Sequence, residues 1–365
     1  MEVDLDKVAE NTRLLKKACG KRVIAVLKAD GYGCGDCQVA RAVIEGGADM
    51  LAVSSLDEAM MLRNEGFATE ILILGATDKE NVGVMIENNI TAAAYSMDWV
   101  QALKDVDCQG LKVHLKVDTG MNRIGFREES EMAKARDILL QLGCRLEGIF
   151  THFSCADFDL GFTKMQYDRF KHAVEALGGG FEWIHCDNSD AAVGFIDDYT
   201  NACRIGISLY GVSTYYKGLH YPISLHTRVV MVKHVHKGDK IGYGATYEAS
   251  GDEIIATLPI GYADGFIRKN QGRRVYVDGQ YGIVVGRVCM DQAMVRLEKE
   301  VEPGTLVEIF GAHIHLEDMA QELDTIPYEV ICLISGRVTR NYTWHGEQEK
   351  ENARMIKSEA LNTTD

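Results

Sequence analysis

The chain has 365 residues, which suggests two domains; 46% of the residues are hydrophobic and 25% are charged, values that exclude a mainly disordered or collagen-like chain. Acidic residues outnumber basic ones by 54 to 39, giving a formal net charge of −15. Nonspecific binding to nucleic acid or to an acidic membrane surface is therefore disfavoured.

The first residues and the cysteines favour a cytoplasmic protein. The N-terminal segment is acidic where a secretory signal would be basic, and the apolar runs of the sequence are far shorter than the roughly 20 residues of a membrane helix. The 10 cysteines are scattered through the chain without the spacing of a small secreted protein, so we expect reduced thiols.

Residues 1–222 alternate between short β-branched runs and stretches with helical periodicity. Residues 128–142 place Met132, Ala135 and Leu139 on one helix face, and Ser55 is positioned to cap a helix that follows it. This alternation predicts a (β/α)8 barrel of the TIM type, although a doubly wound parallel sheet shares much of the pattern. The predicted strands are 22–27, 50–53, 71–74, 91–94, 112–117, 147–152, 182–186 and 202–205.

Residues 223–346 are predicted to form a second, mostly antiparallel β domain. Its β-rich runs are separated by glycine-containing turns such as Asp278-Gly279, and only residues 316–323 have helical periodicity. The polar segment 347–365 has little apolar surface to bury, so we expect a frayed tail. The predicted β runs are 225–236, 253–258, 275–277, 283–288, 294–297 and 306–310.

Reactive side chains follow several of the predicted barrel strands. Lys28 comes directly after the first of them, which places it at the mouth where barrel enzymes hold their active sites. A lysine withdrawn from water loses its charge readily and can form a Schiff base, whereas a solvated lysine is the simpler interpretation of this stretch alone. Further reactive side chains lie at or after the ends of other predicted strands, namely Arg123, His152, Ser189 and Arg204. Such a repeated placement rarely arises by chance.

Other patterns carry weaker signals. The glycines at 31, 33 and 35 would let the backbone approach a ligand, but they match neither a dinucleotide nor a Walker motif. Cys34 and Cys37 form a C-x-x-C pair without a second pair at zinc spacing, and the H-x-H pairs at 234 and 313 are typical of a solvated strand face. We therefore predict no metal site.

Ten stretches of the sequence match the motifs of one known family and follow each other in the same order as in that family. They are residues 26–33, 116–125, 151–154, 188–189, 204–207, 209–211, 242–244, 261–265, 286–292 and 327–329. On these stretches the sequence resembles the alanine racemases, which are fold-type III enzymes dependent on pyridoxal 5′-phosphate. The stretches cover nearly the whole chain. The resemblance implies racemisation of L-alanine and D-alanine, with supply of D-alanine for cell-wall peptidoglycan.

The resemblance also implies roles for individual residues. Lys28 carries the cofactor as a Schiff base and serves as the base for D-alanine, while Tyr243 is the base for L-alanine and comes from the other subunit of a homodimer. In some members the lysine matching Lys116 is carbamylated and supports the arginine matching Arg123. The implied cofactor-binding residues are Lys28, Tyr32, Arg123, His152, Asn188, Ser189, Arg204, Gly206, Ile207 and Tyr328. The implied substrate-binding residues are Arg123, Tyr262, Cys289, Met290 and Asp291.

The sequence departs from the family pattern at a few positions. The chain begins inside what is normally the first strand, and Cys34 occupies a position usually filled by histidine. Asp187 and Asp190 flank the Asn188-Ser189 pair where small residues are more common. These departures leave every implied catalytic group in place.

Three alternatives remain open at the level of sequence. A noncatalytic carrier of the cofactor is disfavoured by the β domain, and a decarboxylase is disfavoured because its glycine-rich phosphate loop is missing. A racemase that prefers serine or another small amino acid, even as part of a larger membrane protein, is the closest rival. Bulky phenols at Tyr262 and Tyr328 favour the methyl side chain of alanine.

Overall fold

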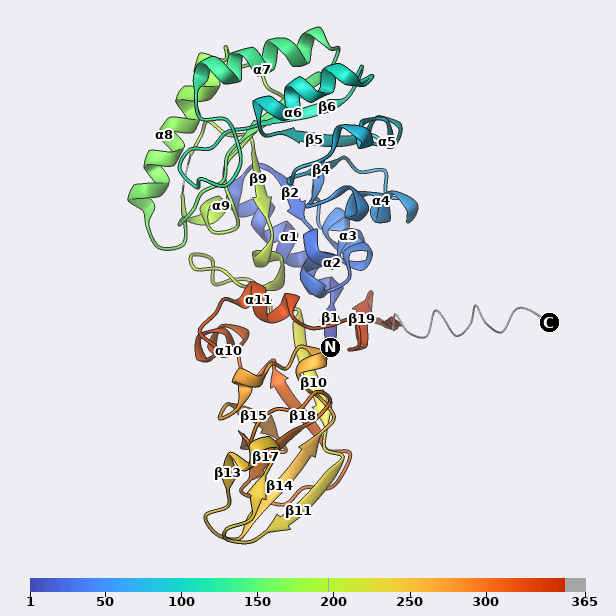
Figure 1. The fold of residues 1–365 in the computed structure, drawn as a ribbon, viewed down its shortest axis with the longest axis vertical. Coiled ribbons are helices and arrows are strands. Elements are labelled where there is room, and N and C mark those ends of the chain that lie inside the picture. The colour runs from blue at the N-terminus through green and yellow to red at the C-terminus, as the bar shows by residue number, and fades with distance from the viewer. Residues whose placement is uncertain (196, 352–365) are drawn as a thin grey trace, which may run out of the picture. The chain divides into compact units, whose positions relative to one another are not determined.

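The computed structural model describes residues 1–195 and 197–351 (Figure 1). Contacts within the chain define two compact units. The barrel unit comprises residues 7–31 and 35–220, and the C-terminal unit comprises residues 1–6, 32–34 and the chain from 221 onward. The units therefore interleave in sequence, whereas the predicted domains, 1–222 and 223–346, are consecutive.

The barrel unit contains a closed barrel of eight parallel strands in chain order, from β2 to β9. The prediction of a (β/α)8 barrel is therefore confirmed. Strands β2 and β9 pair with each other and close the barrel, with Ile24 opposite Arg204. Every residue of β3, β4 and β5 is buried, as expected where helices cover a parallel sheet. The barrel strands are β2 (Arg22–Val26), β3 (Met50–Val53), β4 (Ile71–Ile73), β5 (Ile90–Ala94), β6 (Lys112–Lys116), β7 (Arg145–Phe150), β8 (Trp183–His185) and β9 (Ala202–Ile205).

Helices connect the barrel strands, as blue-to-green ribbons in Figure 1. The predicted helix over 128–142 is α7, in which Met132, Ala135 and Leu139 are buried. Ser55 caps α4, because its hydroxyl accepts a hydrogen bond of 3.4 Å from Glu58 N.

Among the described helices, none combines the length and the apolar character needed to cross a membrane. The α-helices are α1 (Leu5–Cys19), α2 (Lys28–Gly33), α3 (Asp36–Glu45), α4 (Leu56–Asn64), α5 (Val82–Glu87), α6 (Met97–Ala102), α7 (Glu129–Gln141), α8 (Leu160–Ala176) and α9 (Ala191–Gly194). Short 3-10 helices are η1 (Lys79–Asn81), η2 (Leu103–Asp105) and η3 (Ile207–Tyr210).

The C-terminal unit is built on a ten-stranded sheet with the order β11-β14-β17-β16-β15-β18-β10-β1-β19-β20. Only β1 and β19 pair in parallel, so the predicted, mostly antiparallel β domain is confirmed. Asp278 and Gly279 both have positive φ between β15 and β16, as a tight hairpin turn requires. The sheet strands are β1 (Glu2–Asp4), β10 (Ile223–Arg228), β11 (Met231–Val235), β14 (Glu253–Leu258), β15 (Arg274–Val277), β16 (Gln280–Val285), β17 (Ala293–Leu297), β18 (Leu306–Phe310), β19 (Arg340–Trp344) and β20 (Glu347–Glu351). A separate pair comprises β12 (Lys240–Ile241) and β13 (Tyr247–Glu248).

The structure corrects two expectations for this unit. The expected helix is α10 (Leu316–Glu322), but a second helix, α11 (Pro327–Cys332), follows it; six residues are too few for a helical periodicity to be recognised. Residues 347–351, expected to begin a frayed tail, instead form β20 and pair with β19. Residues 352–365 of that expectation lie outside the described residues. Short 3-10 helices are η4 (Tyr243–Ala245), η5 (Tyr262–Asp264) and η6 (Arg268–Asn270).

Candidate active site

Lys28 is the first residue of α2, which begins two residues after β2 ends and is a left-handed helical turn. The φ angles of Ala29, Asp30, Gly31 and Tyr32 lie between 56° and 59°. This conformation costs an L-residue roughly 1–2 kcal/mol, and such strain is concentrated at functional sites. The surrounding structure must therefore hold this turn in place.

Backbone and side-chain hydrogen bonds fix the start of the turn. The carboxylate of Glu58 accepts 2.7 Å hydrogen bonds from Ala29 N and Ser54 N, and so ties the chain after β2 to the chain after β3. Gly31 N donates to Leu27 O at 2.8 Å. Glu58 was not among the predicted site residues, although its place three residues after the helix cap Ser55 is a recognisable signal.

Arg204 on β9 is a buried guanidinium, only 4% exposed. Burial lowers its pKa to about 10, so it remains protonated at neutral pH. Its Nη1 and Nη2 atoms both make hydrogen bonds within the barrel. The described residues supply no acceptor for its third donor group, Nε–H. Nη1 contacts His185 Nδ1 at 2.8 Å and His185 O at 3.1 Å, and Nη2 contacts Thr151 O at 2.6 Å, Cys186 O at 3.0 Å and His152 Nδ1 at 3.2 Å.

His185, a buried histidine at the end of β8, also supports Arg204 and was not among the predicted site residues. Its Nε2 lies 3.0 Å from His114 Nδ1, and its ring stacks on Phe150 at 4.9 Å. Burial and then the charge of Arg204 hold the pKa of His185 well below its usual value, and burial lowers the pKa of His114 to about 3. A neutral His185 that accepts from Arg204 at Nδ1 must donate from Nε2 to His114. The signal in the sequence is a histidine within each of two short strands, His114 between Val113 and Leu115 in β6 and His185 at the end of β8.

Positive groups crowd the barrel end that holds His152. Burial and then Arg204, Lys116, Arg123 and Lys28, in that order, hold the pKa of His152 well below its usual value. Lys116 is itself buried with Nζ 4.7 Å from the centre of the Phe150 ring, and burial and the two arginines hold its pKa well below the usual value. This concentration of positive charge suits an anionic ligand.

Arg123 is carried by a loop that turns back onto the end of β6. Asp118 Oδ1 accepts 3.0 Å hydrogen bonds from Gly120 N and Asn122 N, and Phe126 N donates to Lys116 O at 2.9 Å. Gly125 has a φ of 126°, and a Cβ there would lie 2.8 Å from Asp118 N. The backbone conformation and this close contact therefore require glycine at position 125, where the loop closes.

The ends of β8 and β9 present polar groups suited to a phosphate. Ser189 is buried, and its Oγ accepts a hydrogen bond of 2.9 Å from Gly206 N. Ile207 N, the next amide along, has no hydrogen-bond acceptor among the described residues. Asn188 Oδ1 accepts a hydrogen bond of 3.0 Å from Ala191 N and so fixes the start of α9.

The two aspartates that flank Asn188-Ser189 have partners of their own. Asp190 Oδ1 accepts a hydrogen bond of 2.8 Å from Thr214 N. Asp187 and Asp197 lie near Cys186, a combination of metal-ligand types, but the Lys21 ammonium lies 2.7 Å and 2.5 Å from the two carboxylates. A lysine thus supplies the positive charge at this cluster.

In the C-terminal unit, Tyr32 and Tyr328 lie together, with ring centroids 6.0 Å apart. Tyr32 is 5% exposed, and burial, followed by Tyr328, raises its pKa. Its phenol is therefore protonated at neutral pH and can donate a hydrogen bond.

The remaining predicted residues of the C-terminal unit lie on turn segments that hydrogen-bond to one another. Tyr262 N donates to Cys289 O at 3.0 Å, and Ala263 N donates to Met290 O at the same distance. A Cβ at Gly261 would lie 2.2 Å from Met290 O, so only glycine permits this approach. Asp291 Oδ1 accepts a hydrogen bond of 2.6 Å from Arg337 Nη2.

Tyr243 lies between two glycines with positive φ, at 74° for Gly242 and 72° for Gly244. Its side chain is 70% exposed, and those of Tyr262 and Met290 are 41% and 52% exposed. Single exposed side chains of this kind are common on protein surfaces, whereas a contiguous group of them is a feature of surfaces that bind a partner.

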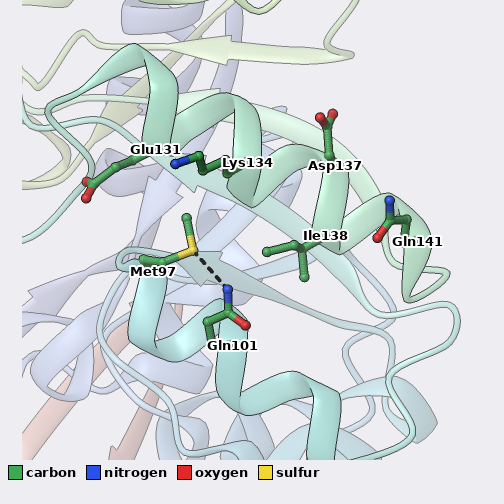
Figure 2. Close-up of a pocket in the computed structure, with 7 residues that line it drawn as sticks. All are labelled: Met97, Gln101, Glu131, Lys134, Asp137, Ile138 and Gln141. Atoms are coloured by element: carbon green, nitrogen blue, oxygen red, sulfur yellow. Dashed lines mark hydrogen bonds between the residues drawn. The ribbon is translucent and has the colours of Figure 1, made fainter.

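A groove of about 400 Å³ between α6 and α7 lies apart from these residues (Figure 2). It is lined by polar and charged side chains together with Met97 and Ile138, and the sulfur of Met97 lies 3.6 Å from Gln101 Nε2. The predicted site residues do not line this groove. Its position on the outer faces of two helices does not match the strand ends at which barrel enzymes act.

The barrel carries a lysine, a buried arginine and further basic side chains at the ends of its strands, an arrangement typical of a barrel enzyme that binds an anionic ligand. Residues 3–214 match the family model described as alanine racemase, N-terminal domain, and residues 222–342 match alanine racemase, C-terminal domain. The chain belongs to the alanine racemase family, as its sequence resemblance implied.

Individual relatives agree with this assignment. The chain is 40% identical to alanine racemase 1 of Bacillus subtilis, over 94% of this chain and 93% of that protein. It is 43% identical to the alanine racemase of Anoxybacillus flavithermus, over 93% of each. The structure of the alanine racemase from Bacillus anthracis with bound L-Ala-P has a TM-score of 0.92 and 37% identity, over 97% of both chains.

Proposed function

We propose that this chain interconverts L-alanine and D-alanine with pyridoxal 5′-phosphate as its cofactor. The observation that carries the proposal is Arg204, whose buried guanidinium keeps one donor available on β9, the strand that pairs with β2 just before Lys28 and its strained turn. The names of the relatives support alanine as the substrate. We also propose a cytoplasmic homodimer with shared active sites that supplies D-alanine for peptidoglycan.

The residues at the barrel strand ends fit this cofactor. The amide of Ile207, which lacks an acceptor among the described residues, and the nearby Ser189 would hold the phosphate, while Arg204 Nε–H would donate to the pyridine nitrogen. Lys28 Nζ would carry the cofactor covalently. When bound, pyridoxal phosphate delocalises the negative charge that forms at the substrate Cα.

The side chains of this chain would then supply the proton transfers and the orientation. Lys28 Nζ would take or return the α-proton on the D-alanine face, and the Tyr243 hydroxyl would do so on the L-alanine face. Arg123 would bind the substrate carboxylate. Arg204 stays protonated at neutral pH and cannot accept a proton from the cofactor ring, which limits side reactions such as transamination.

The proposal is tested on purified protein with added cofactor, in deuterated water, starting from each alanine enantiomer. Both reactions should converge on the racemate with α-proton exchange, and alanine should react faster than serine. Faster turnover of serine would favour the rival racemase. Release of carbon dioxide would indicate a decarboxylase, and absence of exchange would indicate a carrier.

We predict that Tyr328 limits the size of the substrate side chain. Tyr328→Asn should raise the rate of serine racemisation relative to alanine by about tenfold, because removing the ring leaves room for the extra oxygen. It should also weaken cofactor binding. The control is Tyr276→Phe, a change at a tyrosine that stacks on His313 in the same unit, which should leave the ratio of rates unchanged. An unchanged ratio in Tyr328→Asn would rule out the steric role.

We further predict that Lys116 is carbamylated by carbon dioxide. Its lowered pKa leaves Nζ neutral at a lower pH than an ordinary lysine, so Nζ can attack the carbon and release one proton. The negative product would face Arg204 and Arg123. Protein prepared in ¹³C-bicarbonate should show a carbamate carbon by NMR, and the signal should disappear in Lys116→Met.

The matched control for carbamylation is Lys112 at the other end of β6. Its ammonium is paired with Glu70 at 2.6 Å, so Lys112→Met should keep the carbamate signal. A signal that persists in Lys116→Met, or that never forms in the unchanged protein, contradicts the prediction.

A further inference from the structure

Two cysteines of the barrel unit lie in contact where the barrel closes. Cys19 is the last residue of α1, Cys203 lies on β9, and their sulfur atoms are 3.5 Å apart. Cys203 pairs with Val23 of β2, so the contact lies beside the junction of the first and last barrel strands. A disulfide bond measures about 2.05 Å, and a shift of roughly 1.5 Å would therefore allow the bond to form.

The two thiols differ in exposure and in their surroundings. Cys203 is fully buried, whereas Cys19 is partly exposed. The Cys19 sulfur lies 3.6 Å from Lys16 O and 3.8 Å from Lys21 O, and the Cys203 sulfur lies 3.6 Å from Arg22 O. An oxidant arriving from solvent would therefore meet Cys19 before Cys203.

The two thiols also differ in how readily they lose a proton. The hydrogen bond from Cys203 lowers the pKa of Cys19 to about 7; burial and Asp187 oppose this effect, while the Lys21 charge assists it. The pKa of Cys203 is raised by that hydrogen bond and by burial. Near neutral pH, Cys19 thus supplies the thiolate, which is the reactive form, and Cys203 is the protonated neighbour.

We propose that Cys19 and Cys203 form a reversible disulfide on reaction with a hydroperoxide. The Cys19 thiolate attacks the peroxide oxygen, the O–O bond breaks, and the alkoxide or hydroxide that leaves takes up a proton to become an alcohol or water. Cys19 is then a sulfenic acid. The Cys203 sulfur attacks the Cys19 sulfur, the S–S bond forms, the S–O bond breaks, and hydroxide leaves with the Cys203 proton as water. Two thiols are oxidised by two electrons and one peroxide is reduced; a dithiol reductant restores them.

The bond would link α1 to β9 across the closing strand pair of the barrel. Successive side chains on a strand point to opposite faces, so Cys203 and Arg204 lie on different sides of the barrel wall. The link therefore leaves the hydrogen bonds of Arg204 intact. It joins residues 184 positions apart, and closing so long a loop should raise the melting temperature.

The test is peroxide treatment of the purified protein with its cofactor, followed by alkylation and peptide mapping without reductant. A peptide that joins Cys19 to Cys203 should appear, disappear after dithiothreitol, and accompany a melting temperature several degrees higher. The readout is a mass, so it does not depend on the proposed enzymatic reaction. Cys19 recovered unmodified, or retained as a sulfenic acid that dimedone traps in the unchanged protein, would overturn the proposal.

Two variants separate the roles of the thiols. In Cys203→Ala the sulfenic acid cannot be resolved, so dimedone should label Cys19. If that variant does not fold, Cys19→Ala should give neither the linked peptide nor a label on Cys203. The matched control is Cys108→Ala, because Cys108 neighbours a buried cysteine, Cys144, whose pKa burial raises to about 12; the Cys19–Cys203 peptide should still form. Its loss in the control would contradict the assignment.

Discussion

Replacing Lys28 with alanine will abolish racemisation in both directions, with a loss of at least about 10⁴-fold in kcat/KM. The covalent attachment point of the cofactor and the base for D-alanine would disappear together, so neither direction can be spared. Initial rates from L-alanine and from D-alanine, measured separately with excess cofactor, test this. Because the equilibrium constant of racemisation is 1, kcat/KM falls equally in both directions, so α-proton exchange in deuterated water is followed as well. Exchange retained with L-alanine alone would mean that Lys28 is a base but not the attachment point.

The control for Lys28 is Lys112→Ala, a change at a barrel lysine held by Glu70 and Glu147, which should retain activity. Borohydride treatment of the unchanged protein should leave the cofactor on the peptide that contains Lys28. Recovery of the label on any other lysine would contradict the assignment, whatever the rates.

The strained turn after Lys28 illustrates what the sequence could and could not predict. Glycines at 31 and 33 indicate a close backbone approach, but Ala29, Asp30 and Tyr32 also have positive φ, which their side chains disfavour. Local preference therefore predicts a different backbone here. The turn depends on contacts distant in sequence, such as the hydrogen bond from the Tyr210 hydroxyl to Gly31 O.

The barrel strands were predictable because buried parallel strands are continuous apolar runs. Residues whose roles depend on packing between strands could not be predicted from the sequence. His114 and His185 are 71 positions apart, and their contact arises only when β6, β7 and β8 lie side by side. The pairing of β1 with β10 and β19 is likewise invisible in a three-residue strand.

The shared-site proposal concerns the exposed tyrosine of the C-terminal unit. Tyr243 is 70% exposed although a proton-transferring phenol works best away from bulk water, so a second surface must cover it. In the two-fold dimer that we propose, that surface would be the barrel of the other subunit, and each site would combine Lys28 of one chain with Tyr243 of the other. Lys28→Ala and Tyr243→Ala homodimers should each be nearly inactive.

Mixing the two variants distinguishes a site shared between subunits from a site formed within one chain. In a mixed dimer one site carries both defects and the other carries neither, so one intact site returns. With random exchange half of the dimers are mixed, and activity should recover to about a quarter of that of the unchanged protein. If both residues belonged to the same chain, every site in a mixed dimer would carry one defect and exchange would restore nothing. Subunit exchange, followed with differently tagged chains, must therefore be demonstrated in the same sample, since exchange without recovery rules out the shared site.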